Sequence, residues 1–336
     1  MNLIRPIALD DLDALLRLAQ GAGAGFTSLP PVPEFLRRKI ERSLQSFAHE
    51  VRVPGHERYM FVLADSDSGE IGGCCAVEAA CGLDEAFYNY HVGIAVHASR
   101  ELKIYNRIPT LNLSCDYTGA SVLCSLYLRP EFRCGGTGHL LSKCRLLFMA
   151  AFPQRFADKV IAEMRGVSDE YGRSPFWEGL GRHFFSLEYN DAEHIVGMGN
   201  KAFIAELMPP HPIYTVLLPP EARAVMGQVH PQTAAALRLL EQEGFRYQHY
   251  IDIFDGGPTV EAPRAEIRTI RTTCALPAIV SKDLGTDFCL IGNARLRDFR
   301  CTAAAAHLHT DRIEIDAATA RVLKVESGDI VHAAPL

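Results

Sequence analysis

The strongest hydrophobic pattern in the chain is an apolar run followed by an amphipathic stretch. Residues 122–128 are almost all apolar and are stopped by Pro130, which predicts a buried strand. From residue 140 the apolar positions recur at helical spacing. These positions are Leu140, Leu141, Cys144, Leu147, Phe148 and Ala151. The segment RCGGTGHLLSK lies between strand and helix, so the pattern predicts a glycine-rich turn that opens a helix.

Further strands and helices are predicted before and after this turn. The chain opens with a short strand, two acidic residues (Asp10 and Asp11) and an amphipathic helix that glycines end. Residues 57–80 show strand-like positions around a polar turn, which predicts a β-hairpin. For residues 83–121 we expect strands with a long functional loop, and residues 158–166 predict another buried strand.

Two later segments resemble each other. SPFWEGLGRHFF at 174–185 predicts a short helix and the beginning of a strand, and residues 233–257 predict a helix, a glycine stop and an aromatic strand. One sheet with an insertion between them explains the pattern, and a partial duplication is the alternative.

The composition changes after residue 262. Residues 265–336 lose the long helical pattern and show short strands such as DFCLIG and DRIEID. We therefore expect two parts, 1–262 and 265–336. The first has insertions near 83–121 and 184–228, and the second is a small β-rich appendage.

Composition and charge exclude several classes of protein. A formal net charge of −6 argues against nucleic-acid binding, which uses a basic face. No window has eighteen uninterrupted apolar residues and the N-terminus has no signal-peptide pattern, so we expect neither a membrane span nor export. The ten cysteines include no C-x-x-C pair, which predicts reduced thiols in a cytoplasm and no metal site.

The glycine turn itself predicts an anion site. Free N–H groups and the positive end of a helix dipole point forward from such a turn, and a phosphate is the natural ligand. The third glycine of a dinucleotide-binding fingerprint is missing here, and no Gly-Lys-Ser/Thr of a Walker loop occurs, so we expect no nucleotide cofactor. After these two motifs are excluded, the pattern left in the turn is Arg133-x-x-Gly136-x-Gly138.

This spacing resembles the pyrophosphate-binding signature of the GNAT superfamily of acyl-CoA-dependent N-acyltransferases, and the order of elements agrees with it. Longer segments are similar to the arginine N-succinyltransferase family over roughly residues 1–262, and the tail from 265 resembles the family only loosely. The segments are FTSLP, VHASRELKIYN, LLSKCRLLFMAAFP, IAEMRGVSDE, SPFWEGLGRHFF, KAFIAELMPPHPIY, GQVHPQT and GFRYQHYIDIFDGGPT.

The resemblance implies an α/β (α+β) GNAT-like fold, with a mixed central sheet flanked by helices. It also implies transfer of succinyl from succinyl-CoA, as co-substrate, to the α-amine of L-arginine, without a metal. Backbone amides of residues 133–138, including Gly135, Gly136 and Gly138, would hold the CoA pyrophosphate, and Arg133 would add charge. The main chain at Leu126 would bind the pantetheine arm and polarise the thioester.

Proton transfer needs a group that titrates near neutrality. The resemblance indicates His230 as proton donor, although a helix-capping or buried histidine is the structural alternative. His97 is the second candidate, and it would equally serve to position the substrate.

The arginine guanidinium needs a carboxylate, and the substrate carboxylates need donors. Glu163, Asp116 and Glu78 are the candidate acids, since each lies on or beside a predicted strand. The candidate donors are Arg100, Arg165, Ser28 and Thr27. Trp177 is expected in the core. Cys124 and Cys134 are expected to be bystander thiols, because no paired base is visible.

Three rival functions follow from the same residues. One is acylation of another amine such as ornithine. Another is a silent acyl-CoA-binding subunit of a mixed oligomer, whose mark would be a broken glycine signature. The last, a nicotinamide oxidoreductase, is discounted by the missing third glycine. We expect a homo-oligomer, with a homologous partner chain as the alternative.

Overall fold

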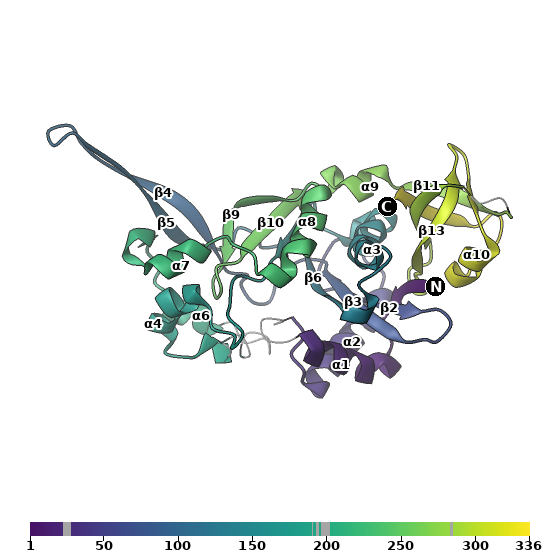
Figure 1. The fold of residues 1–336 in the computed structure, drawn as a ribbon, viewed down its shortest axis with the longest axis horizontal. Coiled ribbons are helices and arrows are strands. Elements are labelled where there is room, and N and C mark those ends of the chain that lie inside the picture. The colour runs from purple at the N-terminus through teal and green to yellow at the C-terminus, as the bar shows by residue number, and fades with distance from the viewer. Residues whose placement is uncertain (23–27, 190, 193–194, 196–201, 283–284) are drawn as a thin grey trace.

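Ten strands of a fifteen-stranded mixed sheet form the centre of the molecule in the computed structural model (Figure 1). The structure describes residues 1–22, 28–189, 191–192, 195, 202–282 and 285–336. The strands follow one another in space as β1 (Asn2–Pro6), β2 (Arg58–Asp65), β3 (Ile71–Glu78), β6 (Ser121–Leu128), β7 (Lys159–Glu163), β10 (Pro258–Pro263), β9 (Arg246–Asp252), β4 (Asn89–Ser99), β5 (Ile104–Ser114) and β8 (Ile213–Tyr214).

Helices cover both faces of this sheet. The described α-helices are α1 (Leu12–Ala22), α2 (Pro33–Ala48), α3 (Thr137–Ala151), α4 (Arg182–Phe185), α6 (Ala202–Leu207), α7 (Pro220–Val225), α8 (Ala234–Gln242), α9 (Arg268–Thr272) and α10 (Ala317–Leu323). Helices α1 and α2 lie on one face, and α3 lies on the other (Figure 1). Accordingly, Met60 and Val62 of β2 pack with α1 and α2, whereas Phe61 and Leu63 pack with α3. Burial on both faces explains the continuous apolar runs of the sequence.

The sheet divides between β6 and β7, which are the only parallel neighbours among the described central strands. Strands β6 and β7 share the register pairs Ser121↔Val160 and Val122↔Ile161 and separate beyond them. Both strands continue for several residues after the last pair, to Leu128 and Glu163. A gap therefore opens between two adjacent strands, beside the glycine turn.

Residues 83–121, for which strands with a long functional loop were expected, contain two strands after an irregular segment. They contain a hairpin, β4–β5, paired from Asn89↔Ser114 to Ser99↔Ile104 and closed by the short turn 100–103. The hairpin projects far from the rest of the molecule at upper left (Figure 1). The expected strands are confirmed, and β-branched and aromatic residues extend their pairing to the tip. The longer irregular segment is 79–88, which precedes β4.

The C-terminal part is a small closed barrel. Its strands are β11 (Cys274–Val280), β12 (Asp287–Asn293), β13 (Cys301–Leu308), β14 (Ile313–Ile315) and β15 (Ile330–Pro335). The order β12-β15-β11-β14-β13 closes on itself because β12 also pairs with β13, and β13 joins β1 at Cys301↔Ile4. The β-rich appendage is confirmed, with α10 as a helix that the strand pattern did not show.

One predicted strand is a helix. Residues 182–185 form α4, which continues a π-helical turn at Trp177–Gly181. The helical path stacks Phe185 on Trp177, with ring centroids 5.3 Å apart, in a second apolar cluster. The segment 174–185 therefore does not continue into the expected strand, whereas 233–257 form α8, a turn and β9 as expected. Trp177 is in the core, as predicted.

Among the described residues, none of the helices is both long and apolar enough to span a bilayer. Six of the ten cysteines are buried, and all ten are thiols.

Candidate functional site

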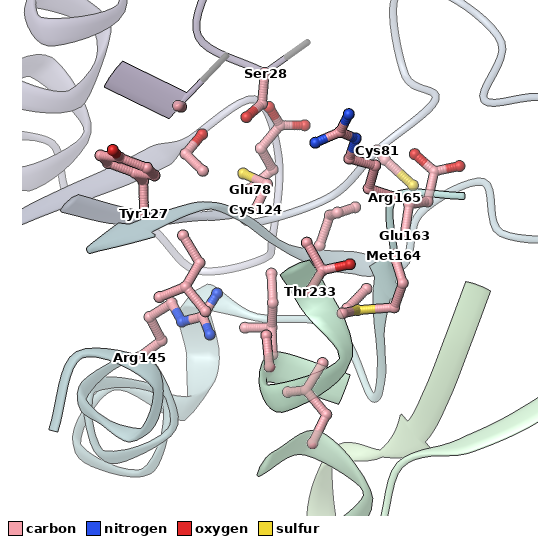
Figure 2. Close-up of a pocket in the computed structure, with 18 of the residues that line it drawn as sticks. Ser28, Glu78, Cys81, Cys124, Tyr127, Arg145, Glu163, Met164, Arg165 and Thr233 are labelled. Atoms are coloured by element: carbon pink, nitrogen blue, oxygen red, sulfur yellow. The ribbon is translucent and has the colours of Figure 1, made fainter. Parts of the chain in front are cut away.

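A cavity of about 1140 Å³ occupies the gap between β6 and β7. One end is formed by the glycine turn and the beginning of α3, and the other by α2 and the connection that follows β3. Residues of α8 line it from below, and Thr233, just before α8, lies beneath the strand in the close-up (Figure 2). The cavity therefore runs from a helix N-terminus into the divided sheet.

The wall formed by β6 is irregular at its centre. Ser125 has a positive φ of 54°, which is uncommon for a non-glycine residue, and the register with β3 shifts between Cys74 and Ala76. The bulge falls where β6 has already left β7, so the main chain at Ser125 and Leu126 lines the cavity. Ser125 and Leu126 have no register partner on β3 at this place.

The glycine turn presents an open concave surface. Gly135 and Gly136 have φ of 56° and 79°, and a Cβ added at either residue, or at Gly138, would meet no atom within 4 Å. Arg133 is exposed beside the turn, and its Nε donates to the Leu128 carbonyl at 2.9 Å. The first-turn amides of α3 point forward from a helix of fifteen residues. This geometry suits a phosphate-bearing ligand.

Charged side chains lie on the α2 side of β6. Arg58, buried at the start of β2, pairs with Glu78 and donates to Ser125 Oγ at 2.9 Å. Lys39 of α2 donates to the Ser28 carbonyl at 2.8 Å. In Figure 2, Ser28, Glu78 and Cys124 lie together on this side, and Arg145 lies on the opposite side.

The β7 wall carries a separate polar group. Glu163 Oε1 accepts a hydrogen bond from Asn89 Nδ2 at 2.9 Å, and Arg165 donates to Ser168 Oγ at 2.9 Å. Asp255 accepts from the Gly166 amide at 2.6 Å and anchors the end of this wall. Burial and the neighbouring Asp252 carboxylate raise the pKa of Asp255 to about 8. Glu163 and Arg165 thus offer both signs of charge to one cavity.

His230 lies at the edge of the cavity and not in its wall. Its backbone N–H donates to the Arg165 carbonyl at 2.8 Å, and Gln232 and Thr233, two and three residues on, line the cavity. The ring caps a short 3₁₀ turn, because its Nδ1 accepts from the Gln232 amide at 3.2 Å. Burial and the Arg165 guanidinium lower the pKa of His230, so the ring is neutral at pH 7. The capping role and a role in proton transfer are both compatible with this position.

The structure brings together most of the predicted site. The predicted residues that line the cavity are Ser28, Glu78, Leu126, Arg133, Gly135, Gly136, Gly138, Glu163 and Arg165. Thr27 lies outside the described residues.

Three predicted residues lie away from the cavity. His97 is on the projecting hairpin, paired with Asn106, and Arg100 is in the turn at its tip. Asp116 is exposed in the turn between β5 and β6, where it accepts from Tyr250 Oη at 2.6 Å, a bond that lowers its pKa. The hairpin carries His97 and Arg100 outward, and proximity in sequence to a strand was misleading for Asp116, which lies in the turn after the hairpin.

Sequence reasoning missed Lys39, Arg58 and Ser125. Arg58 had a signal, since a charged residue opens an apolar strand. Lys39 was missed because no helix was predicted over 33–48, although Pro33 at a first helical position marks one. The positive φ of Ser125 has no sequence signal.

One group of side chains bears on the expectation of no metal. His307, His309 and Glu314 of the barrel have ligand atoms within 4.8 Å of one another. Arg312 Nε lies 3.3 Å from the same Glu314 oxygen that faces His309, so a guanidinium already competes for that carboxylate. The group belongs to the barrel and not to the cavity.

Comparison with known proteins agrees with this geometry over the whole chain. The family model described as arginine N-succinyltransferase beta subunit matches residues 2–269, and the model of its C-terminal domain matches residues 271–335. The chain belongs to the arginine N-succinyltransferase beta subunit family. The resemblance predicted from sequence segments is therefore confirmed. It also extends through the barrel, whose sequence by itself resembles the family only loosely.

Individual relatives cover nearly the full length of the family member described here. Arginine N-succinyltransferases of Salmonella schwarzengrund (strain CVM19633) and Salmonella enteritidis PT4 (strain P125109) are each 50% identical over 334 residues, 99% of this chain and 97% of theirs. The solved arginine/ornithine succinyltransferase subunit AI of Pseudomonas aeruginosa superposes with a TM-score of 0.92 at 41% identity, covering 100% of this chain and 98% of that one. The protein is an acyl-CoA-dependent N-acyltransferase with a mixed α/β fold, as predicted.

Proposed function

We propose that this chain transfers the succinyl group of succinyl-CoA to the α-amine of L-arginine, giving N2-succinyl-L-arginine and CoA, the first step of arginine catabolism by the succinyltransferase route. The observation that carries the proposal is one cavity that joins the open glycine turn to the gap between β6 and β7, in a chain matched end to end by one family.

In this proposal the glycine turn holds the CoA pyrophosphate. The amides at Gly135, Gly136 and Gly138 donate to phosphate oxygens, and Arg133 adds positive charge from the exposed side. An amide of the β6 bulge at Leu126 donates to the thioester oxygen and stabilises the negative charge that develops there. The alternative of a silent subunit is disfavoured, because such a subunit is expected to have a broken glycine signature and the signature is intact here.

The reaction forms one bond and breaks another. The arginine nitrogen attacks the thioester carbon, an N–C bond forms, and the C–S bond breaks to release the CoA thiolate. The amine loses a proton and the thiolate gains one. We propose that His230, neutral at pH 7, first accepts the proton that the attacking amine loses and then acts as the predicted proton donor to the departing thiolate.

For the acceptor we propose the β7 wall. Glu163 would pair with the guanidinium, and Arg165 with the α-carboxylate. Ser28 would contact substrate from the opposite wall. Ornithine is the second candidate acceptor, because the solved relative is described as an arginine/ornithine succinyltransferase.

The test is release of free CoA thiol by the purified protein. We expect release with succinyl-CoA and arginine, and much less with acetyl-CoA. Higher turnover of ornithine than of arginine would reverse the acceptor assignment. No release from any pair, with succinyl-CoA still bound in calorimetry, would contradict the proposed activity and favour the silent-subunit alternative.

We also propose a homo-oligomer that forms through the β4–β5 hairpin. The hairpin exposes apolar side chains at Ile94, Val96, Leu102, Ile104 and Tyr105, with 44–69% of each accessible. His97 would then face a neighbouring chain. Light scattering should give a mass above 37.1 kDa that falls for L102E/Y105E; a homologous partner chain in the purified assembly would instead indicate a mixed oligomer.

Two further expectations remain proposals. We propose a division into 1–262 and 265–336, with the insertions near 83–121 and 184–228; the first barrel strand begins at Cys274, and the two family models meet at residues 269–271. We propose a cytoplasmic location, which the ten thiols support.

A further inference from the structure

An excess of positive charge lines the cavity wall beside the β6 bulge. Arg58 is only 3% exposed, and it bridges Glu78 and Ser125. Its Nε is buried and has no hydrogen-bond partner among the described residues. A buried guanidinium nitrogen without an acceptor is costly, so the positive charge of Arg58 is incompletely compensated beside the cavity.

Lys39 adds a second cation to this wall. Its Nζ lies over the Phe35 ring, 4.7 Å from the centroid, and donates to the Ser28 carbonyl. Burial and the Arg58 guanidinium lower the pKa of Lys39 to about 7; Arg42 also lowers it, and Glu78 and Cys124 oppose this effect. Lys39 and Arg58 both line the cavity and repel each other, with the Glu78 carboxylate, which pairs with Arg58, as counter-charge, and a second carboxylate would relieve this repulsion.

The position of the two cations decides which group of the substrates they meet. Ser125, which Arg58 contacts, immediately precedes Leu126, where the thioester carbonyl is proposed to lie. A succinyl group carries its free carboxylate two methylene groups beyond that carbonyl. The guanidinium of an arginine acceptor would be repelled here, whereas Glu163 on the β7 wall would attract it.

We propose that Lys39 and Arg58 bind the free carboxylate of the succinyl group and so select a dicarboxylic acyl donor over an uncharged one. The inference rests on the proposed function and assigns the donor specificity of its cavity to residues of α2 and β2. The α-carboxylate of the arginine acceptor is also an anion that two cations would attract. The experiment must therefore distinguish binding of the donor carboxylate from binding of the acceptor carboxylate.

The experiment compares Lys39→Met with wild type for succinyl-CoA and butyryl-CoA, which has the same chain length without the carboxylate. Dissociation constants and kcat/KM are measured for both donors. We expect the preference for succinyl-CoA to fall about tenfold or more, because one charge-assisted contact is lost, with butyryl-CoA affinity unchanged. Arg58→Lys, which keeps the charge but shortens the reach, should show a smaller loss in the same direction.

Lys159→Met is the matched control. Lys159 also lies over an aromatic ring, 5.4 Å from the Tyr117 centroid, but it does not line the cavity. The preference of Lys159→Met for succinyl-CoA over butyryl-CoA should equal that of wild type. A second comparison, arginine against argininamide with succinyl-CoA as donor, tests the acceptor carboxylate.

An unchanged donor preference in Lys39→Met would overturn the proposal. Loss of the preference for arginine over argininamide, with donor preference intact, would also overturn it and assign the cations to the acceptor. Absence of turnover by wild type would contradict the proposed function instead, and the dissociation constants would still decide whether the two cations bind the donor carboxylate.

Discussion

At the residue scale, conformational strain and ligand contact can be separated within the glycine turn. Gly136 and Gly119 have nearly the same backbone, with φ of 79° and 84°, and a Cβ at either would meet no atom within 4 Å. Only Gly136 lines the cavity. The two positions therefore differ in ligand exposure and not in strain.

Alanine at either glycine should lower the free energy of unfolding by a similar amount, about 1–2 kcal/mol, because both would hold a left-handed residue. Only Gly136→Ala should also weaken CoA binding, by about tenfold, since its methyl group enters the pyrophosphate position. Calorimetric titration with CoA measures this. Equal CoA affinities of the two variants would contradict the assignment of the turn.

The role of His230 predicts how kcat/KM depends on pH. A group that must be neutral to accept a proton causes kcat/KM to fall as the pH drops below its pKa. Because burial and Arg165 lower the pKa of His230, this acid limb should lie below pH 6.5. His230→Gln should reduce kcat by about 10²-fold or more and abolish the limb. Retention of both kcat and the limb would leave His230 only its capping role.

At the element scale, a buried ion pair fixes α3 relative to α8 and α9. Lys143 of α3 and Glu243, just after α8, are 3% and 1% exposed and lie 3.1 Å apart. Glu243 also accepts a hydrogen bond from the Thr269 amide of α9 at 2.7 Å. Two walls of the cavity, α3 and α8, are thus held at one point away from the ligand.

Lys143→Met should lower the free energy of unfolding by about 3–5 kcal/mol, because it leaves the Glu243 carboxylate buried without a counter-charge. K143M/E243Q should regain part of that loss. Arg182→Met is the control, since its pair with Glu188 is exposed and should contribute little to stability. Chemical denaturation measures all three; a loss in Lys143→Met no larger than in Arg182→Met would refute the assigned role.

At the scale of the whole molecule, the C-terminal barrel has an apolar cluster of its own and also shares the main core. Phe299, Leu290 and Ala334 of the barrel region belong to the same apolar cluster as the α3 residues. The Phe299 ring centroid lies 5.0 Å from that of Phe148 and 5.8 Å from that of Phe61. The barrel therefore covers a face of α3 that would otherwise be exposed.

Because of this shared core, the whole chain should unfold in a single calorimetric transition. Phe299→Ala should destabilise it by about 3–5 kcal/mol without splitting the transition. Phe288→Ala, on an exposed barrel position, should change stability by about 0.5 kcal/mol or less. Two transitions, one of them insensitive to Phe299→Ala, would show that the barrel is independent.

The sequence by itself determined the local parts: the strand, glycine turn and helix around Gly136, the first hairpin, and the family. These follow from short-range spacing, since glycine conformation and hydrophobic period act within a few residues. The tertiary structure decided which distant residues meet. It brought Lys39, Arg58 and Ser125 together and carried His97 and Asp116 away. Strand order and the bulge in β6 place these side chains, and neither leaves a local pattern in the chain.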